Sequence, residues 1–168
     1  MQIQEAFNIL RNDLVALYGE RESALIAHWV IEYITGFSRS ARLIHNTDSL
    51  TADQESDFHK FQTELLQWRP VQYVLGEAWF CGMKFFVDER VLIPRPETEL
   101  VVERALAHVP AGSASSVLDL ATGSGAIALA IASERPGCRV VGTDLSPDAV
   151  MLAIRNAARL DLQRVEFC

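Results

Sequence analysis

One stretch decides the fold of this chain: Asp119-Leu120-Ala121-Thr122-Gly123-Ser124-Gly125. It follows a short apolar run, 117–120, and precedes a segment dense in Ala, Ile and Leu, 126–134, which is typical of the turn between a buried strand and a helix. Gly123 and Gly125 carry no side chain, so a ligand can approach the backbone closely there. The first turn of the helix adds free amide donors. The pattern predicts a ligand-binding loop.

A second carboxylate, Asp144, stands at the end of the next predicted strand, 139–143. In a parallel sheet, an acid at this place can accept hydrogen bonds from ribose hydroxyls. The glycines and Asp144 together predict a nucleoside site at the carboxyl end of a parallel sheet.

Two classes of cofactor fit such a site. The spacing Gly123-x-Gly125-x-x-Ala128 matches the dinucleotide fingerprint, so NAD is the serious alternative. Asp119 argues against NAD, because a carboxylate there would oppose a pyrophosphate. S-adenosylmethionine has no phosphate, and its ammonium and sulfonium groups are cationic, so a nearby carboxylate attracts it. The motif therefore favours a methyltransferase.

Around this loop the chain alternates between strand and helix patterns, which builds a parallel sheet through right-handed crossovers. The expected strands are 117–120, 139–143 and 164–167, and the expected helices are 126–134 and 147–160. A further helix runs from Glu97 to about His108, and a small-residue connector, 111–115, leads from it to the sheet.

Upstream, aromatic-rich runs at 77–80 and 84–87 are separated by Cys81-Gly82-Met83, which predicts a β-hairpin. The first seventy or so residues have helical spacing. We expect helices ending at Gly19 and Gly36, a short helix at 39–44, and another that opens with a capping box at Thr51 and stops before Pro70. These segments predict a small helical bundle.

The bulk composition narrows the function. The net charge is -7, with 22 acidic against 15 basic residues, so direct binding of nucleic acid by an overall positive field is not expected. No apolar run is long enough to span a bilayer, and the N-terminus does not resemble a signal peptide. Three widely spaced cysteines show no metal-ligand pattern. We expect a cytoplasmic protein without a metal site or membrane contact.

Three further stretches carry a family resemblance: Arg69-Pro70-Val71-Gln72-Tyr73-Val74-Leu75-Gly76, then Phe80-x-Gly82-x-x-Phe85-x-Val87, then Val91-Leu92-Ile93-Pro94-Arg95-Pro96-Glu97-Thr98-Glu99. In this order they resemble the release factor glutamine methyltransferases, the PrmC/HemK family. The resemblance runs from about Arg69 to Leu160.

The resemblance implies a helical substrate-docking domain at 1–72, a β-hairpin linker at 73–95, and the first part of a Rossmann-like methyltransferase domain at 96–168. It implies methyl transfer from S-adenosylmethionine, leaving S-adenosylhomocysteine, to the glutamine side-chain nitrogen in the Gly-Gly-Gln motif of peptide chain release factors. Such a protein would act in translation termination.

The family's cofactor roles fall on the loop and its neighbouring strand ends; those residues are Asp119, Ala121, Thr122, Gly123, Ser124, Gly125 and Asp144. The family usually has glycine where Ala121 stands, and its methyl is tolerated if the backbone there is not at positive φ. The substrate-site candidates are Arg95, Pro96, Glu97 and Thr98, although helix capping alone would also explain the acid and the threonine.

The family's catalytic Asn-Pro-Pro-Tyr motif does not occur in this sequence. The motif is needed because a glutamine amide nitrogen is a poor nucleophile that must be held in line by carbonyl acceptors. We therefore expect the catalytic residues beyond Cys168 and an inactive fragment of a longer protein. The alternatives are an N6-adenine methyltransferase acting on DNA or RNA, and a non-catalytic nucleotide-binding module.

Overall fold

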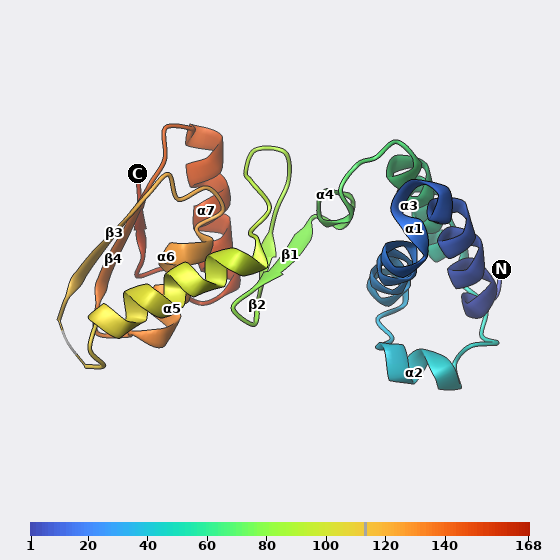
Figure 1. Cartoon of the computed structure of the whole chain (residues 1–168), viewed down its shortest axis with the longest axis horizontal. Helices are drawn as coiled ribbons and strands as arrows, with labels where there is room; N and C mark the ends of the chain where they lie inside the picture. The colour runs from blue at the N-terminus through green and yellow to red at the C-terminus, as the bar shows by residue number, and fades with distance from the viewer. Residues whose placement is uncertain (113) are drawn as a thin grey trace. The chain divides into compact units, whose positions relative to one another are not determined.

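The computed structural model describes residues 1–112 and 114–168 and divides the chain into two compact units, Met1–Leu75 and Gly76–Cys168 (Figure 1). Ser113, inside the expected small-residue connector, lies outside the described residues. The domain limits at residues 72 and 95 stay a prediction.

The first unit is built from helices α1 (Ile3–Thr35), α2 (Arg39–Ile44), α3 (Ala52–Leu66) and α4 (Val71–Leu75). Within α1, Gly19 leaves the helical conformation at φ 75° and ψ 168°, so α1 consists of two helices joined at a kink. Gly36 ends it in the left-handed conformation, and its N–H donates to the carbonyl of Glu32. Both glycine breaks confirm the expectation from the sequence, because glycine adopts positive φ without a steric cost.

The capping box of α3 is also confirmed. The Gln54 N–H donates to the Thr51 hydroxyl at 3.3 Å, and the Thr51 N–H donates to the Gln54 side chain at 2.9 Å. Helix α4 differs from the expectation from the sequence, in which Pro70 only ends a helix. Its carbonyl accepts from the N–H groups of Tyr73 and Val74, so Pro70 also begins the next helix.

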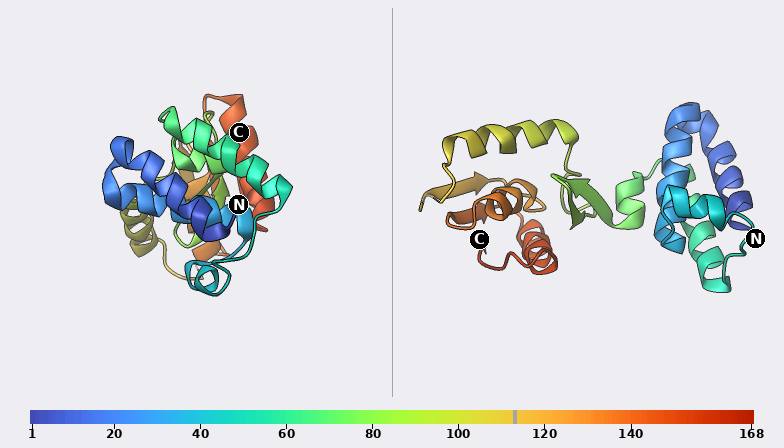
Figure 2. Two further views of the ribbon diagram at one scale, coloured as in Figure 1. Left: turned by 90° about the vertical axis from the view of Figure 1, so that its right-hand side faces the viewer. Right: turned by 90° about the horizontal axis from the view of Figure 1, so that it is seen from below.

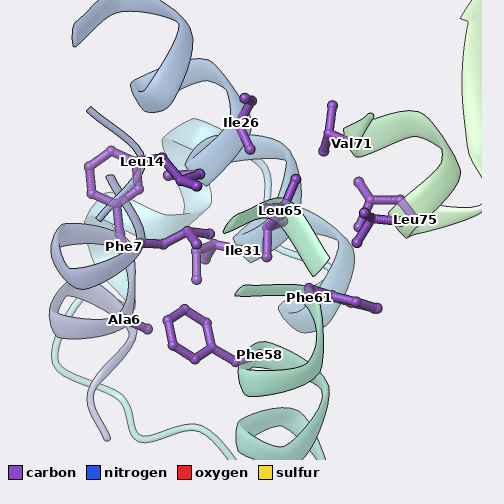
Figure 3. Close-up of a cluster of buried hydrophobic side chains, with 14 of the residues drawn as sticks. Ala6, Phe7, Leu14, Ile26, Ile31, Phe58, Phe61, Leu65, Val71 and Leu75 are labelled. Atoms are coloured by element: carbon purple, nitrogen blue, oxygen red, sulfur yellow. The ribbon is translucent and has the colours of Figure 1, made fainter. Parts of the chain in front are cut away.

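The core of this unit lies between α1, α3 and α4 (Figure 3). Its members are apolar side chains that recur on one face of each helix, as amphipathic helices require. They include Leu10, Leu14, Ala27, Val30, Ile31, Phe58 and Leu65, which are fully buried.

The second unit begins with the hairpin of β1 (Glu77–Phe80) and β2 (Met83–Phe86), which Figure 2 shows as two antiparallel arrows. Its turn residues Cys81 and Gly82 have φ of 46° and 71°. Positive φ at both positions is the type I′ geometry that suits the twist of a two-residue hairpin. The hairpin predicted from the aromatic runs is confirmed.

A three-stranded parallel sheet follows, with the strands in the order β3 (Ser116–Leu120), β4 (Arg139–Thr143) and β5 (Glu166–Phe167). The helices of this unit are α5 (Glu99–His108), α6 (Ala126–Glu134) and α7 (Pro147–Arg159). A short 3₁₀ turn, η1 (Pro96–Thr98), precedes α5. Helix α6 packs on β3 and β4, and α7 packs on β5. A helical region, a hairpin and a partial α/β Rossmann-like unit with parallel strands confirm the architecture expected from the sequence.

The register of β3 against β4 positions the site. Leu120 pairs with Thr143, so both strands reach the same edge of the sheet at the same level. The Thr122 N–H then donates to the carbonyl of Thr143 at 2.8 Å. The loop after β3 is thereby held beside Asp144, the first residue after β4.

Gly142 of β4 lies in a tightly packed part of the sheet. A Cβ added there would lie 2.6 Å from the Phe167 ring and 2.8 Å from the Thr122 hydroxyl oxygen. We predict that Gly142→Ala lowers the free energy of unfolding by about 1–3 kcal/mol, because overpacking forces neighbours to shift. Chemical denaturation measures the effect.

A double-mutant cycle with Phe167→Ala provides the control. Removing the ring relieves the main clash, so the double variant should lose less stability than the sum of the single variants. Additive losses would contradict the packing at Gly142.

Candidate functional site

The loop 121–125 turns sharply from β3 into α6. Ala121, Gly123 and Gly125 all have positive φ, at 58°, 54° and 78°. At Gly125 a Cβ would lie 3.0 Å from the Phe167 ring and 3.2 Å from the Cβ of Ala153, so that position requires glycine for space as well as for conformation. The backbone of the loop is therefore fixed closely against the sheet.

Ala121 has a positive φ, which the expectation from the sequence did not allow for. Its methyl was expected to be tolerated if φ were not positive, and φ is 58°. A left-handed L-residue other than glycine costs about 1–2 kcal/mol. The side chain is exposed, so the methyl meets no crowding that adds to this cost. Ala121 is a strained residue at the entrance of the loop.

Asp144 joins the tip of β4 to the loop. One carboxylate oxygen accepts from the Gly123 N–H at 2.9 Å and the other from the Ser146 N–H at 3.0 Å. These bonds hold the pKa of Asp144 below its ordinary value, and the bond from Ser146 has a larger effect than the bond from Gly123. Each oxygen keeps a second lone pair, so an ionised Asp144 can still accept hydrogen bonds from a ligand.

Asp119 lies near the end of β3 and is more enclosed. Its carboxylate accepts from the Thr122 hydroxyl at 2.6 Å. Burial raises the pKa of Asp119, and the negative charge of Asp144 adds to the rise, while the hydrogen bonds from Thr122 and the Ala128 backbone oppose it. An acid whose charge is penalised in this way is stabilised by a cation that arrives beside it.

The structure thus brings the predicted cofactor residues together at one edge of the sheet. Thr122 and Ser124 are buried, at 7% and 4% exposure, and serve the shape of the loop. The hydroxyl of Thr122 is already engaged with Asp119, so it is not available to a ligand, whereas both carboxylates keep acceptor capacity.

The substrate-site candidates lie apart from this loop in the sequence, at the start of α5. Arg95, Pro96 and Glu97 are exposed and Thr98 is half-buried, on and before the η1 turn. Thr98 makes no side-chain capping hydrogen bond. Pro96 lines a cleft of about 410 Å³ between the hairpin, α5 and α6. The role of these four residues in substrate binding stays a prediction.

Asn156 is a site residue that the sequence did not single out. It is fully buried in α7, and its amide nitrogen donates to the Ser124 carbonyl at 2.9 Å and to the Phe86 carbonyl at 3.0 Å. Its oxygen accepts from the Phe86 N–H at 2.6 Å. The sequence held one indication of this role, because Asn156 is the one polar residue among the alanines and the leucine that form the buried face of α7.

Within residues 1–112 and 114–168, no group of three or more His, Cys, Asp or Glu side chains is arranged to hold a metal ion. No helix of this part of the chain is both long and apolar enough to cross a membrane.

Two family descriptions match the chain. Residues 5–76 match the PrmC N-terminal domain, and residues 111–168 match a methyltransferase domain. Together they cover nearly all of the helical unit and all three strands of the parallel sheet.

Curated relatives bear one name. The release factor glutamine methyltransferase of Chlorobaculum tepidum is 43% identical to this chain, and the match covers 85% of this chain and 51% of the relative. The protein of the same name from Salmonella typhimurium is 42% identical, and the match covers 84% of this chain and 50% of the relative. The Escherichia coli protein is 38% identical, covering 94% and 57%. The chain spans about half the length of the curated relatives it matches.

Among solved structures, an RNA methyltransferase from Salinibacter ruber in complex with S-adenosyl-L-homocysteine is 32% identical with a TM-score of 0.39. It covers 45% of this chain, which covers 48% of it. A S-adenosylmethionine-dependent methyltransferase from Agrobacterium tumefaciens is 24% identical with a TM-score of 0.46, covering 54% of this chain and 30% of its own.

The strain at Ala121 can be measured. We predict that Ala121→Gly raises the free energy of unfolding by about 0.5–1 kcal/mol, since relief of the left-handed conformation outweighs the greater unfolded-state entropy of glycine. Ala158→Gly, at an exposed position in the last turn of α7, is the matched control and should lower stability, by up to about 1 kcal/mol. A loss of stability in Ala121→Gly would contradict the φ found here.

The lowered pKa of Asp144 predicts a pH dependence. The unfolded carboxyl has a pKa of about 3.9, and the folded one lies lower, so its stabilising contribution is present above about pH 4 and is lost as the pH falls through the folded value. Asp144→Asn should therefore lower the melting temperature at about pH 7, and this difference should shrink toward about pH 3. A difference that does not depend on pH would show that the charge of Asp144 has no part in folding.

Proposed function

Since this chain is a relative of the release factor glutamine methyltransferases, with a PrmC N-terminal domain followed by the first part of a methyltransferase domain, we propose that it binds S-adenosylmethionine for methylation of a glutamine side-chain nitrogen in peptide chain release factors. The observation that carries the cofactor assignment is the pair of carboxylates at adjacent strand ends. S-adenosylmethionine supplies an electrophilic methyl group on a cationic sulfur.

Asp144 is assigned to the ribose. It is ionised at neutral pH, since its pKa is lowered by Ser146 and Gly123, and its free lone pairs can accept from two hydroxyl groups. The Gly123 N–H that it binds keeps the carboxylate in one orientation. A preoriented acceptor loses little entropy when a ligand binds.

Asp119 is assigned to the cationic amino acid part of the cofactor. Its ionised form is penalised by burial and by Asp144. The penalty falls when a positive charge approaches, whereas a pyrophosphate would increase it. This difference supports S-adenosylmethionine over NAD, although the spacing of Gly123, Gly125 and Ala128 fits both.

Methyl transfer to a glutamine amide also needs groups that accept its N–H bonds and aim its nitrogen at the methyl carbon. We propose that these come from the Asn-Pro-Pro-Tyr motif, which this sequence lacks, and that the 168-residue chain binds cofactor without transferring methyl groups. Arg95, Pro96, Glu97 and Thr98 are proposed to line the approach of the glutamine.

The protein partner is proposed to be a release factor, which the helical unit would help to dock, and the place of action is proposed to be the cytoplasm. The net charge of -7 supports a protein substrate over DNA or RNA. An assay with a release factor, duplex DNA and RNA as separate acceptors would decide between these substrates, using a longer form of the protein that contains the catalytic motif.

Isothermal titration of the chain with S-adenosylhomocysteine tests the cofactor assignment. Asp144→Ala should weaken binding by about 1–3 kcal/mol, or roughly 5- to 150-fold, because hydrogen bonds to the ribose are lost. Asp148→Ala, at an exposed acid in the first turn of α7, is the control and should leave the affinity unchanged.

A parallel titration with NAD separates the rival class. Binding of NAD with no response to S-adenosylhomocysteine would overturn the methyltransferase proposal. Equal affinity in wild type and Asp144→Ala would remove Asp144 from the site.

A further inference from the structure

We propose that Asn156 is a positioning residue that couples the β-hairpin to the cofactor loop. This inference rests on the proposed function, because it concerns the same loop. Asn156 lies on α7, a helix that contacts both β2 and β5. Its single side chain bonds to the backbone of Phe86 in the hairpin and of Ser124 in the loop.

The orientation of the Asn156 amide is fixed by its partners. The Phe86 N–H can only donate, and the carbonyls of Phe86 and Ser124 can only accept, so the oxygen must face the N–H and the nitrogen must face both carbonyls. Both N–H donors and the oxygen are then engaged. The side chain is fully buried, so water cannot replace a lost bond.

The bond to Ser124 completes a set of attachments that hold the loop. The Thr122 N–H donates to the Thr143 carbonyl, and the Gly123 N–H donates to Asp144. The carbonyl of Ser124 accepts from Asn156, which fixes the peptide plane that also carries the Gly125 N–H. This plane also sets the direction of the Gly125 N–H, which donates to the Thr122 carbonyl at 2.9 Å, and thereby the start of α6.

The hairpin side of the contact is firmly anchored. Arg155 and Arg159 of α7 place their guanidinium groups 3.8 Å and 4.1 Å from the Phe86 ring centroid. Phe86 is thus held to α7 through both its ring and its backbone. A shift of β2 would move Asn156 and, through it, the carbonyl of Ser124.

A purely structural role would join β2 to α7 and leave the loop unaffected. The positioning role, unlike the purely structural one, requires the N–H donor of the Asn156 amide that bonds to Ser124. Asn156→Asp keeps the size of the side chain and an oxygen to accept from Phe86, but it removes both N–H donors. Leu152→Ala, one turn earlier on the same helix and 1% exposed, is the control that weakens packing without touching these bonds.

The experiment measures the affinity of the full chain for S-adenosylhomocysteine at a temperature where circular dichroism shows each variant to be folded. Asn156→Asp should bind at least tenfold more weakly than wild type, and Leu152→Ala should stay within twofold. Lowering the pH should narrow the difference in affinity between Asn156→Asp and wild type measured at the same pH, since a protonated carboxyl regains one donor, and should leave the ratio between Leu152→Ala and wild type unchanged. An Asn156→Asp variant within twofold of wild type, or equal losses in both variants, would overturn the proposal.

Amide hydrogen exchange gives a readout that needs no ligand. In Asn156→Asp the amide of Gly125 should exchange at least tenfold faster than in wild type, whereas the amide of Phe86, whose acceptor oxygen is kept, should change much less. In Leu152→Ala the ratio between Gly125 and the rest of the sheet should stay unchanged. If wild type does not bind S-adenosylhomocysteine, the proposed function fails. The exchange rates then still test the coupling between the hairpin and the loop, and an unchanged rate at Gly125 in Asn156→Asp would overturn that coupling. Asn156→Ser, which keeps one donor, replaces Asn156→Asp in both measurements if the latter does not fold.

Discussion

The hydrogen bond from the Gly123 N–H to Asp144 joins the loop after β3 to the tip of β4. It forms only because Leu120 and Thr143 are paired in register, which brings the two strand ends to the same level of the sheet. The bond orients the carboxylate and helps to lower its pKa, and it involves Gly123 in its left-handed conformation. Together with the hydrogen bond from the Thr122 N–H to the Thr143 carbonyl, it holds the loop glycines and Asp144 in one site.

The two carboxylates of the site are held in opposite electrostatic states. Asp144 is stabilised as an anion by backbone N–H groups, whereas burial and the charge of Asp144 penalise the anion of Asp119. One acid is therefore a ready acceptor for hydroxyl groups, and the other gains most from a positive charge. A ligand that combines a ribose with a cationic tail suits both, which is why the pair supports S-adenosylmethionine as the cofactor.

The local patterns of the sequence predicted much of the fold because each depends on neighbouring residues. Gly19 and Gly36 break helices, Thr51 and Gln54 form a capping box, and Cys81-Gly82 closes a hairpin. The predicted cofactor residues also meet, since strand ends in a parallel sheet are neighbours by topology. What the sequence could not reveal depends on three-dimensional packing: the left-handed backbone of Ala121, and the contacts of Asn156 with segments far away in the chain.

The central claim is that the loop and both carboxylates bind S-adenosylmethionine and its product. The most direct measurement is a titration of the isotopically labelled chain with S-adenosylhomocysteine, followed by the amide resonances in nuclear magnetic resonance spectra. The account predicts that the signals of Gly123, Gly125 and Asp144 shift together and saturate, while those of the helical unit stay in place and NAD produces no such shift. Saturable shifts with NAD alone, or shifts that leave Gly123 and Asp144 unchanged, would contradict it.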